Sequence, residues 1–327
     1  MATQVVLSNG IYLPQLDLWL DARRRQSTAV VSHAHTDHWA KHRQLIGTPA
    51  TLELIRLRWP SVAGQALPYG QPLEQPGYRL TFFPSGHCLG AAQVLIELED
   101  TGERLVYTGD LKLRRNATAE LAPIVPCDVL IVDATYGHPR YCFPADEETL
   151  ERLYHLLDAS LERGAVPVIL AYAVGKAQEV VKLLLERGYR VVVDPIVYQG
   201  ARVYETFGVD FGLAYECFSG TALKGAVLVF SSTAAFNGQS PLRQKRGMFR
   251  FIRMTGWALD GTGPGWPSDG FALPFSDHAG FDDLIAYVEQ AGPRRVYTVG
   301  SFPHLAEELR RRGFDAWHLR EGVLPLF

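Results

Sequence analysis

A short run near the start of the sequence combines three imidazoles with a carboxylate: His33-Ala34-His35-Thr36-Asp37-His38. Residues 28–32 before it are mostly apolar and predict a buried strand. Along an extended backbone His33 and His35 point to the same side, whereas Asp37 and His38 can face a second point after a turn. Neutral imidazole and carboxylate are ligands of zinc and similar divalent ions. The spacing therefore favours a metal-binding site over a polar loop that happens to be rich in histidine.

Zinc takes about four ligands, so further ligands must come from other segments. Two segments that resemble strands each end in one candidate. Residues 82–90 run into a glycine-rich turn that carries His87, and residues 104–110 end in Gly109-Asp110. Loops at strand ends often carry function on a rigid scaffold. We therefore expect His87 and Asp110 to complete the site.

The order of these motifs resembles the metallo-β-lactamase fold: His-x-His-x-Asp-His, then Gly-His, then Thr-Gly-Asp. The resemblance implies an α/β fold, namely an αββα sandwich with metal ions at one edge of two packed sheets. It also implies that His33, His35 and His87 hold a first ion. Asp37 and His38 would hold a second ion, and Asp110 would bridge the two.

Later segments resemble the extra motifs of the β-CASP nucleases. Asp133 precedes Ala134-Thr135-Tyr136-Gly137, as in their first extra motif, and Ser276-Asp277-His278 is similar to the second. At the third, RNA-processing members have a histidine that ligates the second metal, whereas DNA-directed members have a valine, as here at Val299. The compact length and residues 172–179 are most like the bacterial ligase-associated DNA exonucleases, relatives of the Artemis-type DNA repair nucleases.

The resemblance implies a metal-dependent DNA nuclease that hydrolyses phosphodiester bonds, acting as a 5′-to-3′ exonuclease in DNA repair. A metal-bound hydroxide would be the nucleophile. His278 would be the general acid for the leaving 3′-oxygen, and Asp133 would hold its imidazole. With Asp37, these are the expected catalytic residues. A third ligand of the second metal is the alternative role for His278, and a strand-end cap is the alternative for Asp133.

The resemblance also gives expectations for metals and partners. Because Val299 supplies no ligand, we predict one tightly bound Zn²⁺ and a weaker second ion, with Mn²⁺ as the alternative metal. The expected substrate is DNA that is single-stranded or has a 5′ end, and a DNA ligase or helicase is the expected protein partner. Lys176 opens a predicted helix, whose N-terminus favours phosphate. The candidates for substrate phosphate contacts are Ser85, Lys176, Ser232, Thr233 and Arg253.

Three other functions compete with this interpretation. An RNase J-like RNA endo- or exonuclease shares the fold and five motifs, but Val299 argues against it. A small-molecule metallo-hydrolase of the lactamase or glyoxalase kind would lack the Asp133 and Ser-x-His motifs. A non-catalytic binding module would lack ligands, whereas every expected position through Asp110 is filled.

Composition limits the class of protein. The 327 residues are 47% hydrophobic, which is typical of a globular chain with a sizeable core. The net charge of −3 gives no global basic signature for nucleic acid, although a local groove can still be basic. Four cysteines without paired spacing indicate reduced thiols. With no signal-peptide pattern and no apolar run long enough for a membrane span, we expect a cytoplasmic protein without membrane contact.

The pattern of predicted strands and helices changes along the chain. We expect residues 1–140 and 271–327 to form a metallo-β-lactamase domain and residues 141–270 to form an inserted α/β β-CASP cap domain. Within the insert, predicted helices and strands alternate, which is typical of a parallel α/β unit. The predicted helices are 146–163, 176–187, 281–290 and 304–312, the predicted strands of the insert are 166–170, 190–194 and 225–230, a loop covers 260–270, and a further strand ends at His278.

Overall fold

The chain divides into two compact units in a computed structural model. Unit 1 comprises Met1–Cys142 and His278–Phe327, and unit 2 comprises Phe143–Asp277. The structure describes all residues except 1–3, 221–222, 237–241, 243–245, 261–269 and 322–327. Most of the loop predicted at 260–270 therefore lies outside the described residues. The chain leaves unit 1 once and returns to it once, and the identity of unit 2 as a β-CASP cap stays a prediction.

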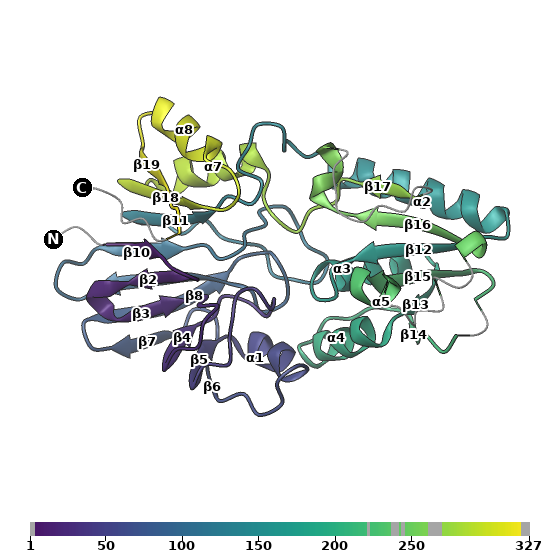
Figure 1. The fold of residues 1–327 in the computed structure, drawn as a ribbon, viewed down its shortest axis with the longest axis horizontal. Coiled ribbons are helices and arrows are strands. Elements are labelled where there is room, and N and C mark those ends of the chain that lie inside the picture. The colour runs from purple at the N-terminus through teal and green to yellow at the C-terminus, as the bar shows by residue number, and fades with distance from the viewer. Residues whose placement is uncertain (1–3, 221–222, 237–241, 243–245, 261–269, 322–327) are drawn as a thin grey trace. The chain divides into compact units, whose positions relative to one another are not determined.

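Two sheets form the framework of unit 1 (Figure 1). The first has the order β1-β2-β3-β4-β5-β6, with antiparallel pairs as far as β3 and parallel pairs after it. The second has the order β19-β18-β11-β10-β9-β8-β7, parallel from β19 to β10 and antiparallel from β10 to β7. The strands of the first are Val6–Leu7, Ile11–Leu13, Leu18–Leu20, Thr28–Val30, Gln44–Gly47 and Gly64–Ala66. The strands β7 to β11, β18 and β19 are Pro72–Gln75, Tyr78–Pro84, Ala92–Leu98, Arg104–Tyr107, Val129–Asp133, Arg295–Val299 and Asp315–His318.

Strand β11 shows how the sequence builds the layers of unit 1. All five of its residues are buried, and successive side chains point to opposite faces of the sheet. Val129 and Ile131 join an apolar cluster that contains residues of both sheets. Leu130 and Val132 join a second cluster on the other face. A strand buried on both faces reads as a continuous apolar run, which is why this segment was predictable.

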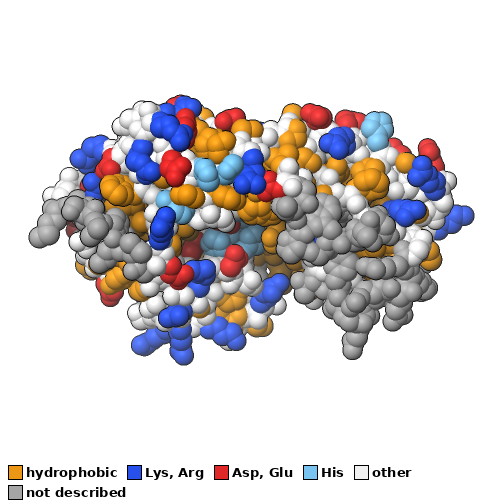
Figure 2. Space-filling view, turned by 45° about the horizontal axis from the view of Figure 1, so that its top comes forward, with side chains coloured by type: hydrophobic (Ala, Val, Ile, Leu, Met, Phe, Trp, Pro, Cys, Tyr) orange, Lys and Arg blue, Asp and Glu red, His pale blue; other side chains and the backbone are white. Residues whose placement is uncertain are grey.

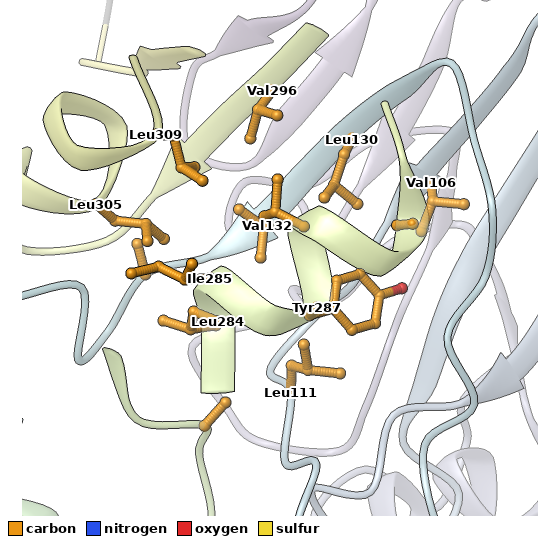
Figure 3. Close-up of a cluster of buried hydrophobic side chains, with 14 of the residues drawn as sticks. Val106, Leu111, Leu130, Val132, Leu284, Ile285, Tyr287, Val296, Leu305 and Leu309 are labelled. Carbon is orange, nitrogen blue, oxygen red and sulfur yellow. The ribbon is translucent and has the colours of Figure 1, made fainter. Parts of the chain in front are cut away.

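Helices α7 (Phe281–Ala291) and α8 (His304–Arg311) cover that other face. In Figure 3, Leu284, Ile285 and Tyr287 of α7 pack beside the β11 side chains, and Leu305 and Leu309 belong to the same cluster. Both predicted helices are confirmed within one residue. The remaining helical elements of unit 1 are α1 (Pro49–Arg56) and the 3₁₀ turn η1 (Pro14–Leu16).

Unit 2 contains a six-stranded sheet of order β14-β13-β15-β12-β16-β17, in which every pair is parallel. The predicted alternation of helix and strand is thereby confirmed. Among the described residues, no helix combines the length and apolar character that crossing a bilayer requires. The strands β12 to β17 are Val166–Ala171, Arg190–Val193, Glu216–Cys217, Ala226–Ser231, Phe249–Met254 and Phe271–Leu273. The helical elements are α2 (Asp146–Glu162), α3 (Lys176–Glu186), α4 (Pro195–Thr206), α5 (Ser232–Phe236), η2 (Arg246–Met248) and η3 (Gly256–Asp260).

Two local expectations differ from the structure. The strand expected to end at His278 ends at Leu273, because Pro274 has no backbone N–H to donate to a sheet. Helix α4 was not predicted, although its start carries a strong signal. The carboxylate of Asp194 accepts hydrogen bonds from the backbone of the second and third helical residues (2.7 and 2.9 Å), and Pro195 occupies the first helical position.

Candidate metal centre

The residues expected to bind metal follow the ends of three strands of unit 1, β4, β8 and β10. Backbone hydrogen bonds hold these loops against one another. The N–H of Ala92 donates to the carbonyl of Ser32 (2.9 Å), and the N–H of Lys112 donates to that of Ser85 (2.9 Å). The N–H of Asp133 donates to the hydroxyl of Thr108 (2.9 Å), which joins the ends of β11 and β10. Side chains that are distant in the sequence therefore lie close together where these strands end.

The turn before His87 requires glycine. Gly86 has φ of 77°, and a Cβ atom added there would lie 2.0 Å from the carbonyl oxygen of Lys112. The side-chain amide of Asn116 donates to the carbonyl of His87 (3.2 Å), which fixes the turn from outside. The glycine in the Gly-His motif therefore has a steric reason that the sequence alone did not give.

One carboxylate oxygen lies at the centre of the cluster. The Oδ2 atom of Asp110 lies 3.4, 3.5 and 3.6 Å from the Nε2 atoms of His33, His38 and His87. The Nε2 atom of His87 lies 3.2 Å from Nδ1 of His35. Two ligands at bond lengths of about 2.0–2.1 Å in a tetrahedral zinc site lie roughly 3.3–3.4 Å apart. The spacing of these atoms therefore suits ligands of a shared cation.

The hydrogen bonds around His33 leave its inner nitrogen without a proton. The hydroxyl of Ser32 donates to Asp21 (2.6 Å), so in the 3.0 Å contact between Ser32 and His33 the imidazole Nδ1–H donates. Nε2 then carries the lone pair, and this buried atom has no hydrogen-bond partner among the described residues. A buried acceptor aimed at other ligands fits a divalent ion, because the second hydrogen bond of a ligating histidine fixes its tautomer.

Asp21 is a residue that the sequence analysis missed. It follows β3, has a left-handed φ of 50°, and is buried. Its carboxylate accepts from the backbone N–H of Ser32 (2.7 Å), the hydroxyl of Tyr107 (2.8 Å) and Nδ1 of His38 (2.8 Å). His38 is thus oriented with Nε2 toward Asp110. The available signal was an aspartate that ends an apolar strand, as Asp133 also does.

Burial and neighbouring charges shift the pKa values of this cluster in different directions. Burial lowers the pKa of His33 well below its usual value, and neighbouring imidazoles lower it further. Burial also acts to lower the pKa of His38, but the carboxylates of Asp110 and Asp21 outweigh it and raise that pKa to about 10. Burial raises the pKa of Asp110. A bound cation would replace protons as the balancing charge, because its ligands bind in their deprotonated forms.

His278 lies beside this cluster and pairs with Asp133. Its Nδ1 atom lies 2.8 Å from Oδ2 of Asp133, and its Nε2 atom lies 3.7 Å from Oδ2 of Asp110. Burial alone would raise the pKa of Asp133, but the charge and hydrogen bond of His278, with the hydrogen bonds of Thr135, lower it. An ionised Asp133 therefore accepts from Nδ1–H and directs Nε2 of His278 toward Asp110, a candidate ligand. This geometry is compatible with either role expected for His278, general acid or metal ligand.

The other expected site residues lie in different environments. Asp37 is exposed, with Oδ2 3.9 Å from Nε2 of His38. Ser85 is buried in unit 1, and its hydroxyl has no partner among the described residues. In unit 2, the ammonium of Lys176 is buried and lies 2.9 Å from Oδ1 of Asp277, so its charge is already compensated.

The remaining candidates for phosphate contacts also belong to unit 2. Ser232 is exposed at the start of α5, and Arg253 is partly buried in β16. The side chain of Thr233 lies outside the described residues. Phosphate binding by any of the five candidates stays a prediction.

No family model matches the chain. The chain is 36% identical over 331 residues to a protein of Opitutus terrae named as a probable DNA ligase, and the match covers 98% of the chain and 31% of the relative. It is 28% identical over 205 residues to an RNase J-like protein of Methanocaldococcus jannaschii, covering 54% of the chain and 48% of the relative. It is 25% identical over 296 residues to the DNA cross-link repair protein SNM1 of Arabidopsis thaliana, covering 83% and 60%.

The chain thus spans less than two thirds of the length of each of these relatives. A crystal structure of a protein of unknown function from Enterococcus faecalis V583 has a similar fold. Its TM-score is 0.60 at 14% identity, with 91% of this chain and 80% of that chain covered. The fold and the buried cluster define an α/β protein with a candidate metal centre. Its motifs and relatives show that the chain belongs to the metallo-β-lactamase β-CASP family.

Proposed function

We propose that the chain is a metal-dependent nuclease that cleaves DNA as a 5′-to-3′ exonuclease in DNA repair. The observation that supports this most is the convergence of His33, His35, His87 and Asp110 beside the His278–Asp133 pair. The relatives named for DNA ligation and for cross-link repair favour DNA as the substrate. Within the family, the ligase-associated exonucleases fit best, with a DNA ligase or helicase as partner in the cytoplasm.

The donor set of imidazoles and one carboxylate fits zinc better than a hard cation such as magnesium, and manganese is the alternative. His33, His35, His87 and Asp110 would hold the first ion, and Asp37, His38 and Asp110 would hold the second. When bound, the ions would polarise a phosphate oxygen and lower the pKa of water toward neutrality. The protein contributes fixed ligand positions, because Asp21 and Ser32 orient two of the imidazoles from behind.

The His278–Asp133 pair would manage the leaving group. Asp133 accepts Nδ1–H and favours the protonated imidazole, so Nε2–H can be donated to the leaving 3′-oxygen. Asp133 also accepts from the backbone N–H of Thr135 (2.8 Å), which keeps its second oxygen aimed at His278. His278 would therefore be a general acid whose orientation is set by the end of β11.

An RNA nuclease is the second candidate, and the RNase J-like relative favours it. In the sheet, Val299 of β18 lies opposite Asp133. Its side chain offers no ligand atom for a second metal, as in the DNA-directed members that the chain resembles, and this favours DNA. Digestion of 5′- and 3′-labelled single- and double-stranded DNA, beside RNA of the same sequence, distinguishes the candidates. We expect mononucleotides released from the 5′ end of DNA. Preferred cleavage of RNA would refute the DNA assignment.

The dead variant for this assay is Asp110→Asn, which removes the charge that the imidazoles of His33, His38, His87 and His278 face. Asp100→Asn is the matched control, since Asp100 lies exposed on a loop of the same unit. We expect activity to be lost in the first variant and kept in the second. Chelation should abolish wild-type activity and added zinc or manganese should restore it. Activity that survives thorough chelation would refute a metal-dependent mechanism.

The weaker second ion is tested separately by metal content. Without a ligand at Val299, we expect one ion retained after dialysis and a second that exchanges. Mass spectrometry of the native protein before and after dialysis measures both. Two equally retained ions would contradict the prediction.

A further inference from the structure

Two loops of unit 1 leave the sheet beside the proposed general acid. Strands β11 and β18 are parallel neighbours with Asp133 opposite Val299, and the N–H of Ala134 donates to the carbonyl of Val299 (2.6 Å). A Cβ atom at Gly300 would lie 2.5 Å from the carbonyl group of Ala134, so the loops begin in close contact. In parallel sheets, ligands bind at the carboxyl ends of the strands, which is where these loops lie.

The loops bring together His138 and Arg140 from one side and Phe302 and His304 from the other; we call these four residues the loop patch. The ring centroids of His138 and His304 are 4.2 Å apart, and those of His138 and Phe302 are 5.5 Å apart. The guanidinium carbon of Arg140 lies 5.8 Å from the centroid of Phe302. Arg140 is exposed and the three rings are partly exposed. Figure 2 shows histidine and basic side chains beside hydrophobic ones on the surface of unit 1.

Hydrogen bonds organise this patch. The backbone N–H and the Nε–H of Arg140 both donate to Nδ1 of His138 (3.1 and 3.2 Å). The neutral imidazole of His138 therefore carries its proton on Nε2, as a donor. The Nδ1 atom of His304 is buried and has no hydrogen-bond partner within the described part of the chain. Rings, a cation and imidazole donors are the groups with which proteins hold an unpaired base and its phosphate.

Two buried tyrosines connect the loop patch with the proposed general acid. The ring of Tyr136 lies 5.8 Å from that of His278 and 4.9 Å from that of Tyr141. The ring of Tyr141 lies 5.6 Å from that of Phe302. Because His278 would protonate the leaving oxygen, a group bound at the loop patch lies on the leaving-group side of the scissile phosphate.

From this placement we infer that the loop patch binds the base of the nucleotide whose 3′-oxygen leaves. The base would stack on the exposed part of Phe302 and the imidazoles, and Arg140 would contact the adjoining phosphate. This inference rests on the proposed function and adds to it a requirement for a base in the terminal nucleotide. A double-stranded end would have to fray before its terminal base could reach the patch.

The test compares two single-stranded DNA oligonucleotides that differ only in their 5′-terminal nucleotide, thymidine or an abasic tetrahydrofuran analogue. The measured quantity is the ratio of kcat/KM for the base-bearing substrate to that for the abasic one. Stacking of one base is worth about 1–3 kcal/mol by alanine substitution, which corresponds to a roughly 5- to 150-fold change. We expect the wild-type ratio to be about fivefold or more and Phe302→Leu to remove most of it. Trp317→Leu, an exposed aromatic on β19, is the matched control and should keep the wild-type ratio.

The outcomes separate this inference from the proposed function. If the wild-type protein cleaves both oligonucleotides at equal rates, or if Phe302→Leu keeps the wild-type ratio, the inference is overturned and the nuclease assignment stands. If the wild-type protein cleaves neither, the proposed function fails and the inference fails with it.

A second variant keeps the test decisive if Phe302→Leu does not fold. Arg140→Gln changes an exposed side chain, and the loss of one phosphate contact should make the slope of log kcat/KM against log salt shallower by roughly 0.7 for a single strand. A shallower slope supports the inference, and an unchanged slope overturns it.

Discussion

Replacing Asp21 with asparagine tests whether the residues behind the candidate ligands control metal binding. Three groups face Oδ2 of Asp21 and one faces Oδ1, so an amide in either orientation turns its NH₂ toward at least one donor. Hydrogen bonds to a charged group contribute about 1.5–3 kcal/mol each, so we expect the metal-free protein to lose roughly 2–3 kcal/mol of unfolding free energy. Loss of an outer partner of a ligand lowers metal affinity about 10- to 100-fold, or roughly 1.4–2.7 kcal/mol.

Zinc affinity is measured by competition with a coloured chelator, and stability by urea denaturation of the metal-free protein. Asp17→Asn is the matched control. Asp17 also has a left-handed φ, of 45°, and also accepts a tyrosine hydroxyl, that of Tyr12 (2.9 Å), but it lies away from the ligands. A zinc affinity of the Asp21 variant within twofold of the wild type would refute the reasoning that orientation of His38 matters for binding.

Three further predictions concern stability. Gly86→Ala should lower the thermal midpoint far more than Gly102→Ala, because both glycines have positive φ but only the first meets a backbone carbonyl; equal losses would show that strain alone decides. Lys176→Met should cost about 3–5 kcal/mol by breaking a buried ion pair, whereas Lys182→Met, in a partly exposed pair with Glu186, should cost under about 1 kcal/mol in urea denaturation. Burial lowers the pKa of His42, so the unfolded chain takes up a proton first as pH falls below about 6.5, and unfolding free energy should fall between pH 7.5 and 5.5. His42→Gln should show a smaller fall, and an unchanged fall would contradict this origin.

The sequence could indicate which side chains lie close together in the candidate metal centre, because each follows a strand end with a recognisable local pattern; their role as metal ligands stays a prediction. His33, His87 and Asp110 each follow an apolar segment: His33 follows β4 of the first sheet, and His87 and Asp110 follow β8 and β10 of the second. Asp133 was predictable for the same reason. The pairing of Asp133 with His278 could be stated only through the family resemblance, because 145 positions separate the two residues.

The parts that could not be predicted depend on burial and on backbone conformation. Asp21 reads as an ordinary aspartate until its left-handed φ and its four donors are seen. Lys176 was expected to meet phosphate because it opens a helix, yet its ammonium lies buried beside Asp277. A sequence shows that a lysine is at a helix start, but it does not show whether a carboxylate distant in the sequence forms an ion pair with it.

The place where the chain returns to unit 1 would matter for the kinetics of the proposed nuclease. His278 is the first residue after the insert, and it is joined to Asp277, the last residue of unit 2, by a single peptide bond. A substitution or a bound molecule that displaces the last residues of unit 2 would therefore also displace the backbone of His278, the proposed proton donor, through this peptide bond. In the proposed nuclease, residues of unit 2 that do not contact the substrate would therefore change turnover without changing the metal content.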